Sequence, residues 1–480
     1  MKTILVVGDL AGSVAYHAGD EAMAEADIEL LRVVFPEVKI IVTSSDPVWS
    51  ARALACDAVR SGSFNACQTE EERVTLLKKS ADDFLSIVAN VDAVVIAGGG
   101  NMTSTWPQHL YERALFVSSA AKLLKPVLIL GQTLGPKLRP NHTAILRDML
   151  RNASLVGVRE AMSAAIAVSL GIEDRRILRQ ADDALFLSPK APLQFPLGFD
   201  PASRWLAVTV HPFAKLGSPE LSRFAAELVR GVADQKIGLL FVPHARAGEG
   251  VDSISDVDIA AELARLTGGW ALPCPSAREA VWAAQHAYAV ISTRYHPLVF
   301  ASSGGVPFLS LPSDAYTATK CLGAQAHVGM VRWSLGLSRA INGELSQAVG
   351  ELIQRRDELS AWLTVVLPYL QNLEAQRRFA VAQCFAAHGF INKNLGERPV
   401  SLDLPASAPQ PVGAWACKGR DSDTDELLEQ FQPASEHTVR YIESLTDALK
   451  FSKHAQATAE SYAKSLENAL RVALKNQAFV

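Results

Sequence analysis

The chain has 480 residues, of which 49% are hydrophobic and 20% are charged, and its formal net charge is −4 at pH 7. This length and composition suit two ordinary domains with large cores plus additional elements. Without a global basic field, nucleic acid is excluded as the main partner. The six cysteines are scattered and contain no Cys-x-x-Cys pair, so they predict neither a zinc site nor a disulfide framework and favour a reducing compartment.

The N-terminal segment does not have the pattern of a membrane signal. It reads MKTILVVGD, with one lysine and a short apolar run that Asp9 interrupts. This run is too short for a signal peptide or a spanning helix, and no later stretch reaches spanning length without charges. We therefore expect a soluble, cytoplasmic protein with at most peripheral membrane contact.

Residues 1–190 are predicted to form a Rossmann-like domain, because buried apolar runs alternate with helical segments. The first strand is expected at residues 3–7, followed by a loop, a helix and a second strand at 39–43. Gly19, Asp20 and Glu21 stand at the start of that helix, where Asp20 is most simply an N-cap.

Three further strands of this domain end in turns that can line a ligand site. Gly99 and Gly100 permit a close approach of ligand or backbone, but their turn matches no dinucleotide-binding or Walker motif. Gln132 belongs to a GQTLGP turn, and Arg159 stands between a strand and a helix start, where a cation can bind an anion. A surface ion pair explains Arg159 equally well. The three strands are expected at residues 93–96, 126–130 and 154–158.

A proline-rich stretch at residues 189–201 precedes a second Rossmann-like domain, expected at 200–395. Its strands again alternate with helical segments, which indicates a parallel sheet. His244 follows the second of these strands and could reach the ligand site. A helical run from Asn342 to about Ala387 is expected to close this domain. The four strands are expected at residues 205–210, 237–242, 287–291 and 306–310.

The strand at residues 287–291 breaks into Ser-Thr-Arg-Tyr-His, which places Arg294 and His296 at a strand end and a helix start. Free backbone N–H groups and the helix dipole favour anionic ligands there. The next strand end carries Tyr316 and Lys320. Two cations and an imidazole therefore converge on one sheet edge, which we interpret as a functional site. Taken singly, Arg294 also fits a surface ion pair, and His296 fits a buried structural histidine.

This pattern of Arg-x-His, a small-residue helix, Gly-Val-Pro and a downstream Tyr-x-x-x-Lys resembles the polysaccharide pyruvyl transferase family. The Gly-Asp-Glu-Ala at residues 19–22, the Gly-Gly loop, the Gly-Gln-x-x-Gly-Pro loop and Arg159 resemble other family motifs in the same order. Together they cover about the first three quarters of the chain. The resemblance implies an α/β fold with two Rossmann-like domains facing a cleft, as in the glycosyltransferase-B architecture. It also implies transfer of pyruvate from phosphoenolpyruvate onto a sugar diol as a cyclic ketal, with release of phosphate.

The residues suit that chemistry. Phosphoenolpyruvate carries a carboxylate and a phosphate, which Arg159, Arg294 and Lys320 could bind. The donor is expected on the side of the second domain and the sugar on the side of the first. His296 is the natural acid for the methylene carbon, and His296 or His244 could be the base. No metal cluster is visible, and we expect no cofactor besides the donor substrate. Further substrate-binding assignments are Asp20, Gly99, Gly100, Gln132 and Tyr316.

Two other functions stay open. One is a nucleotide-sugar glycosyltransferase on the same fold, which sugar-nucleotide turnover would reveal. The other is a catalytically silent scaffold in which the C-terminal helix is the working part. The nearly complete set of cations argues against the silent scaffold, because a protein without activity has no reason to keep them.

The last part of the chain lies beyond the resemblance. Residues 396–434 contain several prolines and an acidic run, which predict a flexible linker. Residues 435–480 are predicted to form a long helix, in which YIESL at 441–445 recurs as YAKSL at 462–466, three heptads later. The resulting apolar seam has a polar middle. It predicts a homo-oligomer through a coiled coil, with packing of the helix on its own body as the alternative.

Overall fold

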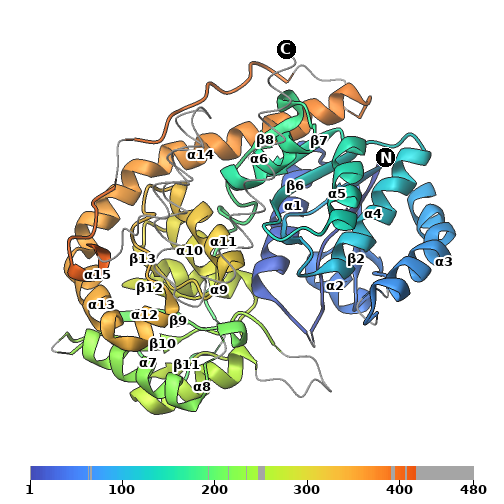
Figure 1. The fold of residues 1–480 in the computed structure, drawn as a ribbon. Coiled ribbons are helices and arrows are strands. Elements are labelled where there is room, and N and C mark those ends of the chain that lie inside the picture. The colour runs from blue at the N-terminus through green and yellow to red at the C-terminus, as the bar shows by residue number, and fades with distance from the viewer. Residues whose placement is uncertain are drawn as a thin grey trace.

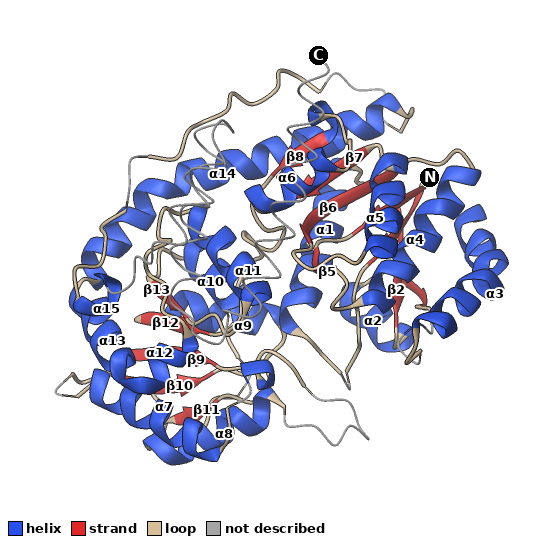
Figure 2. Cartoon of the chain, in the orientation of Figure 1, coloured by secondary structure: helices blue, strands red, loops and turns tan. Residues whose placement is uncertain are grey.

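The computed structural model describes residues 2–417 apart from residues 14, 63, 65, 66, 193, 215, 234, 247–254, 391–394, 406 and 407. The predicted C-terminal helix and the second half of the predicted linker lie outside these described residues. Two parallel sheets, each surrounded by helices, form two domains, and one long helix runs along both of them (Figures 1 and 2).

The first domain is built on an eight-stranded parallel sheet. Its elements are β1 (Thr3–Val7), α1 (Ala18–Val34), β2 (Lys39–Ser44), α2 (Pro47–Leu54), β3 (Asp57–Arg60), α3 (Glu70–Ala89), β4 (Ala93–Ile96), β5 (Gly99–Met102), α4 (Pro107–Lys122), β6 (Val127–Leu134), α5 (Pro140–Asn152), β7 (Leu155–Val158), α6 (Ala161–Ser169) and β8 (Ile177–Arg179). The strand order is β3-β2-β1-β4-β6-β7-β8, with β5 beside β6. The order reverses between β1 and β4, which is where open α/β sheets bind ligands at the carboxyl ends of their strands.

Strand β1 shows why the central strands read as unbroken apolar runs. Its Ile4 and Val6 belong to the hydrophobic core on one face of the sheet, and Leu5 and Val7 belong to the core on the other face. A parallel strand that is covered on both faces has no solvent side to mark with polar residues.

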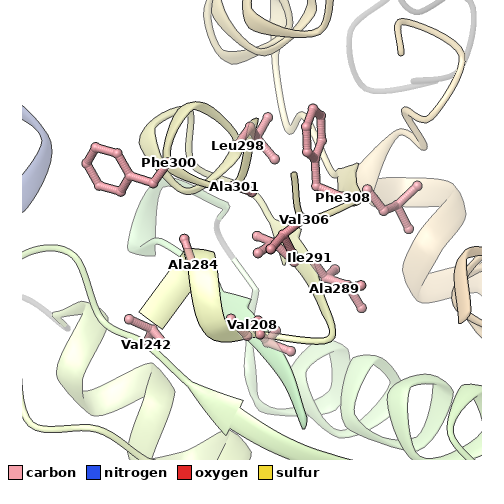
Figure 3. Packing of buried hydrophobic residues seen from close by; sticks show 14 of the residues in the cluster. Val208, Val242, Ala284, Ala289, Ile291, Leu298, Phe300, Ala301, Val306 and Phe308 are labelled. Atoms are coloured by element: carbon pink, nitrogen blue, oxygen red, sulfur yellow. The ribbon is translucent and has the colours of Figure 1, made fainter. Parts of the chain in front are cut away.

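The second domain repeats this plan on a five-stranded parallel sheet. Its elements are β9 (Trp205–Thr209), α7 (Ser218–Gly231), β10 (Gly238–Phe241), α8 (Asp256–Thr267), β11 (Trp270–Ala271), α9 (Ala277–His286), β12 (Ala289–Ser292), α10 (His296–Ser303), β13 (Phe308–Ser310), α11 (Ala315–Ala326), α12 (Leu337–Arg339) and α13 (Leu345–Gln354). The strand order is β11-β10-β9-β12-β13, so the order reverses between β9 and β12. Buried side chains of three strands and two helices meet around β12, among them Val208, Ala284, Ile291, Leu298 and Phe308 (Figure 3).

Two turns that the sequence predicts at ligand-facing strand ends are parts of strands. The first four residues of the GQTLGP segment continue β6 as far as Leu134, and Gly99 and Gly100 open the short strand β5. Strand β6 continues through an irregularity at Gly131, which has a φ of +44°. A Cβ atom there would lie 1.8 Å from Asp183 Oδ2, so only glycine fits this position.

The long helix α14 (Arg356–Ala387) packs on both domains, whereas we expected this region to close only the second. Its Leu359 and Leu363 lie in the second-domain core, and its Val381 and Phe385 lie in a first-domain core. In Figure 1 it is the orange helix that passes from one domain to the other. No helix in the described part of the chain is long and apolar enough to cross a membrane.

The described part of the predicted linker is packed against the second domain. It ends in the short helix α15 (Ala414–Cys417), whose Trp415 is 1% exposed and contacts the ring of Trp333. The Trp415 Nε1–H donates to Glu351 Oε2 at 2.7 Å, and the Trp333 Nε1–H donates to the Pro409 carbonyl at 2.9 Å. The end of the expected flexible linker is therefore held against the second domain, because Ala408 and Trp415 belong to its core.

Candidate interdomain active site

The start of α1 joins the two domains directly. The Ala18 N–H donates to the His244 carbonyl at 2.8 Å, and the Arg246 N–H donates to the Tyr16 carbonyl at 2.9 Å. The Tyr16 hydroxyl also accepts a hydrogen bond of 2.6 Å from the Ala277 N–H at the start of α9. These backbone contacts hold the loop before α1 against the strand ends of the second sheet.

Arg294 lies at this junction, and its guanidinium is engaged on every edge. Its Nε and Nη2 donate to the two oxygens of Asp256 at 2.7 and 2.6 Å. Asp256 is fully buried, so the alternative that Arg294 forms a surface ion pair is wrong: its ion pair lies inside the protein. The third edge, Nη1, lies 2.9 Å from His17 Nε2 of the first domain. A bidentate pair of this kind is geometrically specific.

His17 also contacts Asp20, which is one of the predicted binding residues. His17 Nδ1 lies 2.9 Å from Asp20 Oδ2, and the two side chains are 30% and 20% exposed. Burial on its own acts to raise the pKa of Asp20, but His17 holds that pKa below its usual value. The N-cap residue of α1 is His17, so the prediction that Asp20 caps this helix is wrong.

His296 is enclosed rather than open to solvent. Its side chain is 10% exposed, and its Nε2 lies 4.0 Å from Asp182 Oδ2, too far for a hydrogen bond. A Cβ atom on Gly19 would lie 1.9 Å from His296 Nδ1, so the absence of a side chain on Gly19 makes room for the imidazole. Burial lowers the pKa of His296 to about 3, although Asp182 acts in the opposite direction. His296 is therefore neutral at pH 7 in this state.

Arg159 is buried and already paired. Its Nη1 donates to Asp182 Oδ2 at 2.7 Å, and its Nε donates to Thr133 Oγ1 at 3.0 Å. The guanidinium also lies over the ring of Tyr295, 4.3 Å from the ring centroid. The sequence alternative for Arg159 was a surface ion pair; its ion pair is instead an internal one.

Gly100, Tyr316 and Lys320 meet across the domain boundary. The Tyr316 hydroxyl donates to the Gly100 carbonyl, and Lys320 Nζ lies 3.9 Å from the Tyr316 ring centroid. A Cβ atom on Gly100 would lie 3.0 Å from Tyr316 Oη and 3.2 Å from Arg159 Nη2. Within the part of the chain that the structure describes, no carboxylate forms an ion pair with Lys320.

The remaining predicted residues, Gln132, Gly99 and His244, are buried next to this site. Gln132 is fully buried, and its amide donates to the Ala97 carbonyl at the end of β4. Gly99 stands beside it in β5, where a Cβ atom would lie 3.0 Å from Asn101 Oδ1. His244 is 2% exposed, and burial, followed by the nearby charge of Arg294, lowers its pKa well below the usual value.

His17, Asp182 and Asp256 are the site residues that sequence reasoning left without a role in the site. His17 stands only two residues before the Gly-Asp-Glu segment, a signal that could have drawn attention to it. Asp182 accepts from the Ala184 N–H at 2.9 Å, which stabilises a turn, and it also binds Arg159. Asp256 is the first residue of α8, after the N-cap Ser255, and its side chain binds Arg294.

Comparison with protein families identifies the chain. Residues 17–314, more than half of the sequence, match the family model described as polysaccharide pyruvyl transferase. The chain belongs to the polysaccharide pyruvyl transferase family. The match begins at His17 and ends at Asp314, so it contains Arg294, His296 and their contacts on both domains. A comparison of this pyruvyl transferase family member with curated proteins finds no match.

Solved structures share the fold at low sequence identity. A putative UDP-N-acetylglucosamine 2-epimerase from Listeria monocytogenes is 14% identical, with a TM-score of 0.57 over 84% of this chain and 100% of its own. The S. aureus MnaA–UDP structure is 13% identical, with a TM-score of 0.55 over 84% and 100%. The UDP-GlcNAc 2-epimerase from Neisseria meningitidis, bound to UDP-GlcNAc, is 13% identical, with a TM-score of 0.54 over 81% and 100%. The predicted glycosyltransferase-B-like arrangement of two α/β domains is confirmed.

Proposed function

We propose that this member of the family transfers pyruvate from phosphoenolpyruvate to a sugar diol as a cyclic ketal, with release of phosphate and with no further cofactor. The family match carries the assignment to pyruvyl transfer. The structural observation that supports the donor is the convergence of Arg294, Lys320 and His296 at one boundary between two domains.

The donor can bind at two positions without losing a salt bridge inside the protein. Arg294 keeps both bonds to Asp256 when its Nη1 exchanges His17 for a carboxylate oxygen. Lys320 offers its ammonium group to a second anionic group. The start of α10 is a weaker anion site than the sequence suggests, because Pro297 has no N–H and the Leu298 and Val299 N–H groups donate to the Tyr295 carbonyl. Arg159, in contrast, is committed to Asp182, and we assign it to the support of the site.

The donor also changes the protonation of His296. In the described state this imidazole is neutral, because burial lowers its pKa to about 3. An anionic donor beside it favours the charged form and raises that pKa. His296 can then carry the proton that the methylene carbon receives. Binding of the donor thereby creates the acid that its own reaction needs.

The direct test is incubation with phosphoenolpyruvate and a panel of sugar acceptors, with phosphate release as the measurement. We expect phosphate release that depends on the acceptor, and a ketal product with a new methyl group by NMR. The His296→Ala variant should lose roughly a hundred- to ten-thousand-fold in kcat, more than it loses in affinity for the donor.

Two results would contradict the proposal. Turnover of a nucleotide sugar without turnover of phosphoenolpyruvate would identify a glycosyltransferase on the same fold. A protein that turns over neither donor would point to the silent scaffold. If His296→Ala only raises the Michaelis constant, the transfer reaction stands but the proton comes from another group, and His244 is the next to test.

A further inference from the structure

The proposed reaction needs a base as well as an acid, and the histidines at the junction differ in their fitness for that task. His244 is only 2% exposed, which leaves a substrate hydroxyl little access to it. Among the described residues, the carboxylate that faces His296 is Asp182, whose Oδ2 lies 4.0 Å from Nε2 and so beyond hydrogen-bond distance, and the His296 side chain is 10% exposed. His17 contacts a carboxylate at 2.9 Å, and its side chain is 30% exposed. Only His17 therefore has both an orienting partner and access for a substrate hydroxyl.

The contacts of His17 determine which of its nitrogens carries the proton. Asp20 is ionised at neutral pH, because burial raises its pKa but the hydrogen bond from His17 and the charge of Lys320 lower it below the usual value. An ionised carboxylate can only accept, so Nδ1 donates to Asp20 at 2.9 Å. Arg294 can only donate, so Nε2 presents a lone pair to Nη1 at 2.9 Å. The Asp20 N–H also points to Nδ1, but at 3.4 Å it is the weaker contact.

This arrangement is that of a base held by a carboxylate, with the basic nitrogen masked by Arg294. A carboxylate on the far nitrogen fixes the tautomer and stabilises the imidazolium that forms when the near nitrogen takes a proton. When a donor carboxylate takes over Arg294 Nη1, His17 Nε2 becomes free at the place where the donor is bound. His17 belongs to the first domain, the side that we assign to the acceptor.

We propose that His17, oriented by Asp20, is the general base that deprotonates the attacking hydroxyl of the acceptor. The inference rests on the proposed function and adds to it a catalytic residue, His17, and a positioning residue, Asp20. It also gives Arg294 a second task, because this arginine exposes the base only after the donor has bound.

The protons balance in this scheme. Carbon 3 of phosphoenolpyruvate takes a proton from the acid, and the first hydroxyl oxygen bonds to carbon 2 while its proton passes to His17 Nε2. The second hydroxyl oxygen then bonds to carbon 2 as the bond from carbon 2 to the phosphate oxygen breaks. Phosphate leaves with that electron pair and takes up the second hydroxyl proton as hydrogen phosphate. The proton on His17 returns through solvent and replaces the one that carbon 3 received.

The test compares His17→Gln, Asp20→Asn and the control His286→Gln in the phosphate-release assay. His286 is exposed at the end of α9, outside the site. We expect His17→Gln to lower kcat roughly a hundred- to ten-thousand-fold, with a smaller change in the donor Michaelis constant, and to abolish the acidic limb of the kcat–pH profile. Asp20→Asn should move that limb to lower pH, because the imidazolium that forms on His17 loses the carboxylate that stabilises it. The control should match the wild type.

Each result decides the question. A folded His17→Gln protein that keeps kcat within about threefold, or keeps the acidic limb, overturns the role of His17 in an otherwise active enzyme. If His17→Gln fails to fold, the position of the limb in Asp20→Asn decides alone, since a structural role for Asp20 would lower kcat without moving it. A wild-type protein that releases no phosphate from phosphoenolpyruvate overturns the proposed function itself.

Discussion

Two arginines, Arg377 and Arg294, each bind a buried carboxylate and also contact a residue that lies far away in the sequence. The surroundings of the two guanidinium groups differ. Arg377 of α14 binds Asp27 and Asp183 of the first domain, and its side chain is 3% exposed while both carboxylates are fully buried. Arg294 is 13% exposed and binds one buried carboxylate, Asp256. Its remaining edge faces His17, a neutral and partly exposed partner.

The charges of the two clusters differ as well. Arg377 faces Asp27, Asp183 and Glu374, and Glu374 also pairs with the exposed Arg378, so two cations serve three carboxylates. Burial raises the pKa of Asp27 to about 6, and burial together with Asp27 raises the pKa of Asp183 well above its usual value. An enclosed cluster with excess acid holds a helix in place and has no room for another anion. At Arg294 a ligand can replace a neutral partner and leave the salt bridge intact.

The largest effect on stability is expected from Arg377→Met. This change leaves Asp27 and Asp183 buried without their cation, and breaking a buried pair in this way costs about 3–5 kcal/mol. Urea unfolding measures the loss. The neighbouring Arg378→Met is the control, because Arg378 is 53% exposed and its loss should change the free energy of unfolding by less than about 0.5 kcal/mol. Equal effects of the two variants would show that the cluster does not anchor α14.

Arg294→Lys should have the larger effect on activity and the smaller effect on stability. An ammonium group cannot bind both oxygens of Asp256 and a donor carboxylate in one plane. We expect phosphate release to fall about a hundred- to a thousandfold, the range for loss of a fixed donor in an active site. Circular dichroism checks the fold. Arg265→Lys, an exposed change on α8, is the control, and near-normal turnover in a folded Arg294→Lys protein would remove Arg294 from the site.

The sequence could predict the positions of both arginines relative to secondary structure but not their partners. Arg294 follows an apolar run, so its place at a strand end could be predicted, as could nine of the strands. Strands β3, β5 and β8 were missed because they are short and contain polar residues or glycine, and β11 was missed because it has only two residues. Asp256 begins a helix 38 positions before Arg294, and only the geometry of two strand ends brings them together.

Contacts between domains were the least predictable part of the site. His17 and Arg294 lie 277 positions apart, and Arg377 and Asp27 lie 350 apart. Local periodicity contains no information on how two separately cored domains face each other. Gly19 is an example. Its position at a helix start could be predicted, but the sequence does not show that the missing side chain leaves space for His296 of the other domain.

A third prediction uses pH, because both the site and its surroundings bury neutral imidazoles. Burial lowers the pKa of His296 to about 3 and of His211 to about 4. The unfolded chain binds protons on these groups below about pH 6.5, whereas the folded protein does not, so stability falls as pH decreases from 6.5 to about 4.

His296→Asn should lessen this acid sensitivity by about 1 kcal/mol per pH unit across that window. Melting temperature against pH measures the change, and His286→Asn, an exposed position, is the control. The prediction fails if the His296→Asn protein loses stability toward pH 4 as steeply as the wild type. That result would mean that His296 is accessible to solvent protons, and the contrast between an enclosed His296 and an accessible His17 would disappear.

Removal of the chain beyond Cys417 is expected to have the smallest effect on stability and activity, because it leaves the clusters around Arg377 and Arg294 intact. Truncation at Gly396 would remove Trp415, which is 1% exposed in the second-domain core, and would therefore destabilise the protein for a reason unrelated to assembly. Truncation after Cys417 keeps that core and removes the predicted helix at residues 435–480. Phosphate release and the urea midpoint should stay unchanged. The assembly state in sedimentation should fall, because an apolar seam at heptad spacing needs a partner in water. An unchanged sedimentation size would mean that the helix packs on its own chain or serves a different partner.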